Sequence, residues 1–293
     1  MPYRTAVETT GIMTGTGSMI ASVSDTARWV AVHRAWETER PDALFRDPLA
    51  SRLAGEPGRA ILRAAPAKLR RGWWIVSRTR LIDELIAVAL AQGCDLVLNL
   101  AAGLDARPYR MDLPPNLPWV EVDLPAMVEE KEQALAGERP RCELRRCAVD
   151  LADHAALGEF LDRTLATAER ALVLTEGLLV YLEPAEVLAL STALSRPQIQ
   201  WWVFDLMSEA CRRRVQRQGG EMLTNAPLRF GTDDGVAYFE RLGWKLHSAT
   251  SLFHAAERFR RLPWFQRPLT YWPQPNPRNP GRVPWGGVVS LRH

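Results

Sequence analysis

The pattern of apolar and polar residues predicts helices in the first third of the chain. From Asp25, the stretch TARWVAVHRAWETE places Trp29, Val32 and Trp36 on one helical face, with Asp25 in position to cap the helix. A second, short helix is expected around FRDPLASRLAG, where Asp47-Pro48 suits a cap and a first turn. WWIVSRTRLIDELIAVALAQG has the pattern of a long amphipathic helix that ends at a glycine. The small, polar residues before about position 25 are expected to form a loose segment or a lid.

The pattern changes after Gly93 to short apolar runs separated by segments of helical length. Late in the chain, DGVAYFERLGWKLHSAT predicts a helix, a glycine turn and a strand, and VVSLRH a closing edge strand. Strands that alternate with helices imply a parallel sheet with helices on both faces. The five runs that predict its earlier strands are DLVLNLAA, WVEVDL, CELRRCAVDL, ALVLTEGLLVYL and QWWVFDLM.

Composition narrows the function classes. The 293 residues include 37 basic and 34 acidic ones, scattered together without a basic stripe, and the arginine-rich run at 212–217 is typical of a solvated helix face. We therefore expect no nucleic-acid partner. No apolar run approaches the ~20 residues that span a bilayer, and the N-terminus lacks signal-peptide features. A cytoplasmic protein without a membrane partner is expected. The four cysteines form no CxxC pair and have no histidine at ligand spacing, so no metal is expected.

The turn in LVLNLAAGLDARPYR indicates what the sheet binds. Ligands of open parallel sheets bind beyond the carboxyl ends of the strands, and a dinucleotide pyrophosphate needs the glycines of GxGxxG there. Here only Gly103 is bare, because Ala101 and Ala102 carry Cβ atoms. Asp105 adds a negative charge at the expected helix start, where it would cap the helix and repel phosphate. These features disfavour a nicotinamide oxidoreductase and favour a nucleoside without phosphate, such as S-adenosylmethionine.

Acidic residues follow the next two strands in the positions that such a nucleoside requires. Asp123 ends WVEVDL, where a carboxylate could accept the ribose hydroxyls, and Glu121 points the same way by strand period. Asp150 and Leu151 in AVDLAD follow the third strand, where a polar group could meet the adenine amine. The order of turn, Asp123 and Asp150 therefore favours S-adenosylmethionine.

Six segments resemble the leucine carboxyl methyltransferase-like group of class I S-adenosylmethionine-dependent methyltransferases, including its bacterial natural-product branch. The match runs over roughly residues 25–250. The resemblance implies a single methyltransferase domain over 1–293, with an N-terminal helical cap at 1–90. Its α/β, Rossmann-like core at 91–293 would hold a mostly parallel seven-stranded sheet and an acceptor-covering insertion at about 207–232. The segments are FRDPLA, SRTRLID, NLAAGLDARPYR, VEVDLPAMVEEK, CAVDLAD and LVLTEGLLVYL.

The resemblance assigns the cofactor contacts residue by residue. Arg78 of SRTRLID matches the arginine that holds the carboxylate of S-adenosylmethionine. Gly103 matches the close approach of the backbone, and Asp123 the ribose acid. Asp150 and Leu151 match the adenine contacts.

Further matches surround the methyl group. Glu176 matches a residue beside the methionine portion, and Tyr181 lies about one turn further on. Arg34 lies where a second basic contact is placed, so Tyr181 and Arg34 are expected to shape the catalytic site. The sequence departs from the family at Ala101, where relatives commonly have glycine, although Gly103 is expected to be the more demanding position.

The acceptor is expected to be a carboxylate. Methyl transfer is an in-line displacement that depends on alignment, and a carboxylate is ionised at neutral pH whereas a phenol needs a base. None of the five histidines lies in a motif that fixes it beside the methyl group; His33 is expected to be a packing or surface residue. We therefore predict an O-methyltransferase that acts on a small-molecule or peptide acceptor and yields S-adenosylhomocysteine. A phenol or hydroxyl O-methyltransferase of a polyketide-type metabolite, and a catalytically silent scaffold, remain open.

Many of the eleven tryptophans are expected in the core. Those in the Pro-rich segment from Pro263 to Pro284 could instead line a broad apolar acceptor pocket. The oligomeric state is not determined by the sequence.

Overall fold

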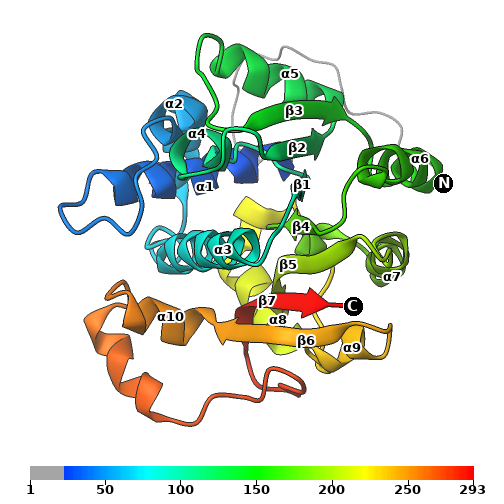
Figure 1. Ribbon diagram of the computed structural model, residues 1–293. Helices are drawn as coiled ribbons and strands as arrows, with labels where there is room; N and C mark the ends of the chain where they lie inside the picture. Colours follow the sequence, from blue (N-terminus) through cyan, green and yellow to red (C-terminus); the bar gives the residue numbers. More distant parts are fainter. Residues whose placement is uncertain (1–22) are drawn as a thin grey trace.

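A seven-stranded sheet forms the centre of the computed structural model, which describes residues 23–293 (Figure 1). The strand order is β3-β2-β1-β4-β5-β7-β6. The five strands from β3 to β5 are parallel, whereas β7 is antiparallel to both of its neighbours. The strands are β1 (Leu96–Leu100), β2 (Pro118–Asp123), β3 (Glu143–Ala148), β4 (Ala171–Thr175), β5 (Ile199–Met207), β6 (Lys245–Ser251) and β7 (Gly286–Arg292).

The prediction of β7 as an edge strand was wrong. It lies between β5 and β6, and the edges of the sheet are β3 and β6. Because β7 lies inside the sheet, both of its faces are covered. All four residues of VVSL are therefore buried, and Ser290 is the one polar residue among them.

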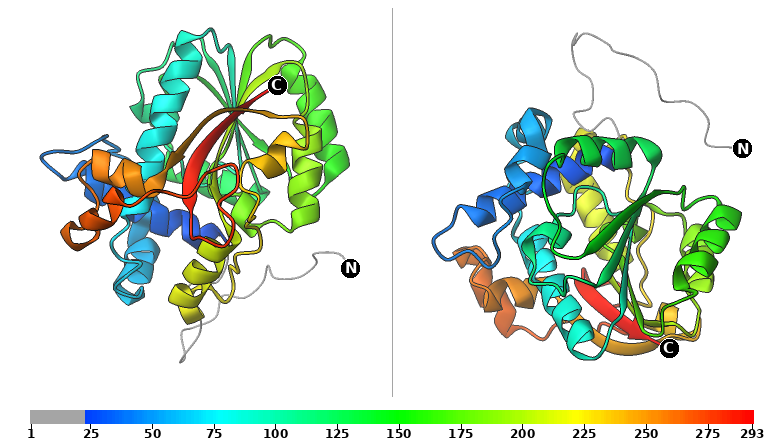
Figure 2. Two further views of the ribbon diagram at one scale, coloured as in Figure 1. Left: turned by 90° about the horizontal axis from the view of Figure 1, so that it is seen from below. Right: turned by 45° about the horizontal axis from the view of Figure 1, so that its top comes forward.

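Helices cover both faces of the sheet (Figure 2). Ten are α-helical and the remaining short segments are 3₁₀ turns within residues 23–293. They are α1 (Val23–Thr38), α2 (Ala50–Ala64), α3 (Trp73–Ala91), α4 (Arg107–Arg110), α5 (Pro125–Ala134), α6 (His154–Leu165), α7 (Pro184–Ala193), α8 (Glu209–Gly219), α9 (Ala237–Glu240), α10 (Leu252–Arg258), η1 (Leu179–Tyr181), η2 (Gly220–Leu223) and η3 (Trp264–Tyr271).

Several helix boundaries differ from those expected. Helix α1 begins at Val23, so Asp25 lies inside its first turn rather than at the cap. Helix α2 begins at Ala50 and continues past a kink at Gly55, where φ is 58°. The helix after the β1 turn, α4, is a single turn. The expected lid falls almost wholly before residue 23, outside the described residues.

The period-2 alternation of β1 explains how the layers form. Leu96, Leu98 and Leu100 pack in one apolar cluster with residues of α6, α7 and α9, whereas Val97 packs on the other face with α3 and α10. A third cluster joins α1 and α2 to Leu104, just after β1. The helices α1 and α2 therefore lie next to the carboxyl end of the first strand.

Among residues 23–293, no helix is both long and apolar enough to pass through a membrane.

Candidate cofactor site

The turn after β1 is held against the end of β2. The Gly103 amide donates a hydrogen bond of 2.7 Å to Oδ2 of Asp123. Gly103 has φ of 47°, and a Cβ there would lie 3.3 Å from Cβ of Ala27 in α1. Glycine is therefore favoured here both by the left-handed backbone and by the close packing of α1.

Ala101 is as unusual as Gly103. Its φ is 54°, so an alanine adopts the left-handed conformation that glycine adopts most readily. Such a conformation costs an L-residue about 1–2 kcal/mol. Gly103 was expected to be the position with the stricter backbone requirement. The left-handed backbone of Ala101 was not expected, because the sequence does not show the φ angle of an alanine.

Asp123 retains acceptor capacity in spite of its two backbone partners. Its Oδ1 accepts the amide of Leu124 at 2.8 Å, and each carboxylate oxygen has a second lone pair. Burial raises the pKa of this carboxyl, and the two amide donors only partly oppose that shift. A small hollow beside it is lined by nine residues: Ala102, Gly103, Glu121, Val122, Asp123, Met127, Val128, Lys131 and Arg146.

Glu121 forms the wall of this hollow as a buried ion cluster. Its Oε1 lies 2.8 Å from Nζ of Lys131, and its Oε2 accepts a 2.9 Å hydrogen bond from Nε of Arg146. Burial still raises the pKa of Glu121, because desolvation outweighs the two cations. The strand period correctly placed Glu121 on the same side as Asp123, but not its partners.

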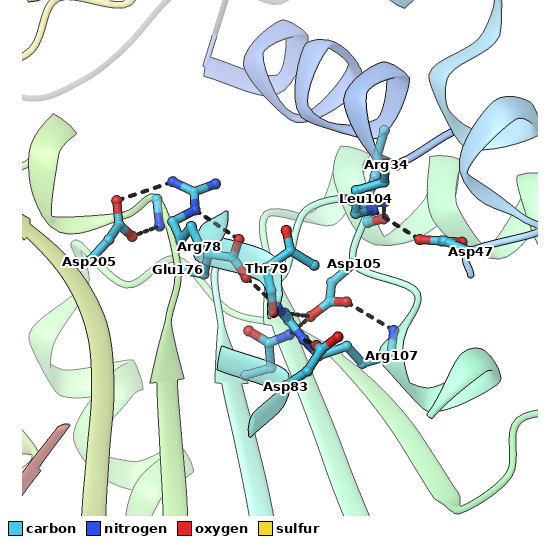
Figure 3. Close-up of polar contacts among 12 residues, drawn as sticks. Arg34, Asp47, Arg78, Thr79, Asp83, Leu104, Asp105, Arg107, Glu176 and Asp205 are labelled. Atoms are coloured by element: carbon cyan, nitrogen blue, oxygen red, sulfur yellow. Dashed lines mark hydrogen bonds and ion pairs between the residues drawn. The ribbon is translucent and has the colours of Figure 1, made fainter. Parts of the chain in front are cut away.

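Arg78 of α3 reaches the ends of β4 and β5. Its Nε donates to Oε1 of Glu176 at 2.9 Å, and its Nη1 to Oδ2 of Asp205 at 3.1 Å (Figure 3). Oδ1 of Asp205 accepts the amide of Gly177 at 2.6 Å. Burial opposes the charge of Arg78, but the two carboxylates outweigh it and raise the pKa of the guanidinium. Nη2 has no partner within residues 23–293, so one donor edge remains for an anion.

Arg107 connects these elements through ion pairs, and the sequence did not predict it as a site residue. Its guanidinium is 2% exposed and donates at 2.7 Å to each of Asp83, Asp105 and Glu176 (Figure 3). Burial raises the pKa of Glu176, but Arg107 and then Arg78 lower it more, so the net shift is downward. The pKa of Asp105 is lowered for the same reason, with Arg107 as its strongest cation. Asp105 is thus chiefly an ion-pair partner, although its Oδ1 also accepts the amide of Arg107.

Arg34 braces the turn from the helical cap. Its Nη2 donates to the carbonyl of Leu104 at 2.5 Å, and its Nε to the buried carboxylate of Asp47 at 2.9 Å. Asp47 therefore anchors Arg34 and does not cap α2. Tyr181 is the other expected catalytic residue; burial raises the pKa of its phenol, which faces Thr26 and Arg78.

Asp150 and Leu151 follow a residue that is hydrogen-bonded to the end of β2. The backbone passes next to the site, because the amide of Val149 donates to the carbonyl of Asp123 at 3.0 Å. The Asp150 carboxylate is exposed and accepts the amide of Ala152 at 2.9 Å. The structure brings Gly103 to Asp123 and Arg78 to Glu176, and within residues 23–293 the Asp150 side chain makes no hydrogen bond to either pair.

His33 is a packing residue, as expected. It is 2% exposed and lies edge-on to Trp29 and Trp36. Burial lowers the pKa of its imidazole to about 4. The ring is therefore neutral at physiological pH and is enclosed by aromatic side chains of the cap.

The sheet is Rossmann-like, and a carboxylate, a glycine turn and a free guanidinium edge lie at the carboxyl ends of its strands. These are the features of a class I S-adenosylmethionine-dependent methyltransferase. The sequence profile of leucine carboxyl methyltransferases matches residues 27–195, and the chain belongs to this family. A relative from Mycolicibacterium smegmatis, assigned to the S-adenosyl-L-methionine-dependent methyltransferases, is 35% identical over 79% of this chain and 86% of its own length.

Further comparisons agree with this class. A relative from Streptomyces avermitilis with the same assignment is 33% identical over 90% of this chain and 93% of its own length. A crystal structure described as a methyltransferase, from Thermobifida fusca YX, superposes with a TM-score of 0.57 at 14% identity, covering 94% of this chain and 96% of that chain. That similarity shows the fold. The chain is an S-adenosylmethionine-dependent methyltransferase, as the turn and the resemblance predicted.

Proposed function

We propose that this methyltransferase transfers its methyl group to a carboxylate oxygen of a small-molecule or peptide acceptor. The proposal rests on the ion-pair partners and the protonation of the acidic and basic side chains around the site. Glu176, Asp205 and Asp105 are all committed to arginines. His33 is buried and neutral, with its pKa lowered to about 4.

A phenol with a pKa near 10 would need a base to remove its proton, whereas a carboxylate arrives ionised. Carboxylates held by arginines are poor proton acceptors, because each arginine stabilises the ionised form. Tyr181 is itself kept protonated, because burial raises its pKa. The residues around the site thus suit an acceptor that carries its own negative charge.

S-adenosylmethionine supplies an electrophilic methyl group on a sulfonium when it is bound. We assign its ribose hydroxyls to Asp123 and its carboxylate to the free Nη2 edge of Arg78. Asp150 and Leu151 would meet the adenine, and Glu176 would lie beside the methionine portion. Gly103 would allow the close approach of the nucleoside.

The protein's part in catalysis is then to position the reactants and exclude water. Good alignment of reacting groups can contribute about 7–11 kcal/mol. Arg34 acts through the turn that it braces, and Tyr181 offers a partly buried phenol next to Arg78. The segment of α8 and η2 would cover the acceptor.

The chemistry of the product tests this proposal. Extracts or acceptor libraries incubated with methyl-labelled S-adenosylmethionine should yield label that mild alkali releases as methanol, because esters hydrolyse and aryl ethers do not. Alkali-stable label would overturn carboxylate methylation in favour of a phenol. Tight cofactor binding with no transfer to any acceptor would indicate the silent scaffold.

A further inference from the structure

Outside the cofactor site, the segment η3 and the residue after it expose an unusual number of aromatic rings. Trp264 is 80% exposed, Tyr271 89% and Trp272 71%. Phe265 and Leu269 of the same segment are also exposed. Soluble proteins rarely display large apolar side chains together without a use for them. We expected these rings to line an acceptor pocket, but in the structure they are largely exposed to solvent.

This aromatic segment lies in a part of the chain that contains no acid. Residues 258–293 include seven arginines and not one Asp or Glu. Residues 57–82 likewise include six arginines, one lysine and no acid. The expectation that basic and acidic residues are scattered together is therefore wrong for these two segments. Acidic residues outnumber basic ones in the rest of the chain.

The fold brings the two acid-free segments together. The guanidinium of Arg71, in the connection between α2 and α3, stacks over the ring of Phe265 at 4.6 Å. Beside this contact, Trp73 meets Phe253 of α10, a few residues before the second segment, with ring centroids 6.1 Å apart. In Figure 1 the segment between α10 and β7, drawn in orange, forms the periphery of the molecule below α3.

Some cations on this face are not neutralised. Lys68, Arg70 and Arg260 are exposed and have no ion-pair partner within residues 23–293. Arg261 does pair with Glu37 and Asp42, and Arg267 lies 3.7 Å from Glu257. Lys68 and Arg70 are close to Arg71 in the chain and Arg260 precedes Trp264 by four residues, and the nearby acids already have partners.

We propose that the aromatic face, comprising Trp264, Phe265, Leu269, Tyr271, Trp272, Lys68, Arg70, Arg71 and Arg260, binds the surface of an anionic phospholipid bilayer. Tryptophan and tyrosine favour the headgroup region of bilayers, where one end of the side chain is apolar and the other hydrated. Flanking cations add attraction to anionic lipids. This contact is peripheral and extends the function beyond methyl transfer, in contrast to the expectation of no membrane partner.

The composition of the face favours a bilayer over other anionic partners. Leu269 and the surrounding prolines cannot stack on nucleobases as aromatic rings do. Rings that are 70–90% exposed on a projecting segment would need matching pockets in a protein partner, whereas a headgroup layer adapts to them. A lipid surface uses both the rings and the cations.

Sedimentation with vesicles tests the proposal on the full chain. The protein should pellet with phosphatidylglycerol vesicles at low salt, much less with phosphatidylcholine vesicles, and progressively less as salt is raised. The triple variant Trp264→Ser/Tyr271→Ser/Trp272→Ser should bind about tenfold more weakly. Lys68→Ser and Arg70→Ser should each weaken binding about fivefold.

A matched control separates this face from general surface hydrophobicity. Val88→Ser/Leu188→Ser removes exposed apolar side chains from α3 and α7 and should bind vesicles like the wild type. All variants should bind S-adenosylmethionine normally, which shows that they fold. Wild-type protein that stays in the supernatant, a triple variant that pellets undiminished, or retention of single-stranded oligonucleotide in place of vesicles would overturn the proposal.

Discussion

Replacement of Arg107 by methionine is expected to destabilise the protein more than any surface change. The guanidinium is 2% exposed and compensates three carboxylates, each at 2.7 Å. In the variant, Asp83 keeps Arg110, and Glu176 keeps Arg78. Asp105 keeps the side chain of Asn99 and its backbone partner as hydrogen-bond donors. One largely buried carboxylate thus loses its only contacting counter-ion within residues 23–293, and the more distant cations compensate it only in part.

The magnitude follows from the cost of breaking a buried ion pair. Removal of one partner typically costs about 3–5 kcal/mol, because the other charge stays buried and uncompensated. That is a large part of the ~5–15 kcal/mol by which a domain is stable. Urea unfolding monitored by circular dichroism should therefore show a clearly lower midpoint for Arg107→Met. Arg107→Lys should lie in between, since lysine keeps the charge but not the planar fork.

The same variant should change the response to acid. The folded-state pKa values of Glu176 and Asp105 are lowered, so their contribution to stability is complete above the unfolded value near 4 and is lost as the pH falls through the folded values. Without Arg107 these carboxyls should protonate more readily. The deficit of Arg107→Met relative to the wild type should therefore be largest at neutral pH and shrink toward pH 3.

Two outcomes would refute this reasoning. One is a deficit below about 1 kcal/mol at pH 7, the size expected of an exposed pair. The other is a deficit that grows on acidification. Arg63→Met serves as the control, because its partner Glu56 is exposed and the urea midpoint should not change measurably.

Three further substitutions test the site and the cap. Ala101→Gly should raise the unfolding free energy by about 0.5 kcal/mol, since relief of the left-handed strain exceeds the added entropy of the unfolded chain; a lower urea midpoint would contradict the strain at this turn. Asp123→Asn should raise the dissociation constant for S-adenosylmethionine at least about tenfold by calorimetry, and should cost about 1 kcal/mol of stability because an asparagine oxygen can accept only one of the two backbone amides; unaltered affinity would remove Asp123 from the ribose contact. Gly72→Ala should cost about 2–4 kcal/mol, because φ is 55° and its Cβ would lie 2.1 Å from Nδ1 of His33; a variant that melts like the wild type would show that the imidazole moves freely.

Much of the candidate cofactor site at the carboxyl ends of β1 and β2 could be predicted from the local pattern of apolar and polar residues. The run Leu96–Leu100 is a fully buried strand, and the residues that follow it form the turn. Asp123 was placed at the end of β2 because strand period and the apolar run fix where that strand stops. Gly103 and Asp123 then meet because neighbouring parallel strands end at the same edge.

The partners of the charged residues could not be predicted in this way. Arg107 joins Asp83, on a helix earlier in the chain, to Glu176, which lies 69 residues further on. No periodicity relates such positions, and an arginine in a turn has the same local pattern whether it is solvated or buried. The exposed rings of η3 were misjudged for a related reason, since the sequence does not say which apolar residues find a covering layer.

By itself, the sequence determined the alternation of helices and strands, the lack of a dinucleotide turn and the place of Asp123 at the end of β2, since these depend on residues close together in the chain. Only the tertiary structure decided that β7 enters between β5 and β6, that Ala101 adopts a left-handed backbone, and that Arg78 and Arg107 share the carboxylates of several elements. The physical reason is that burial and charge compensation depend on distances across the fold, which local pattern does not specify.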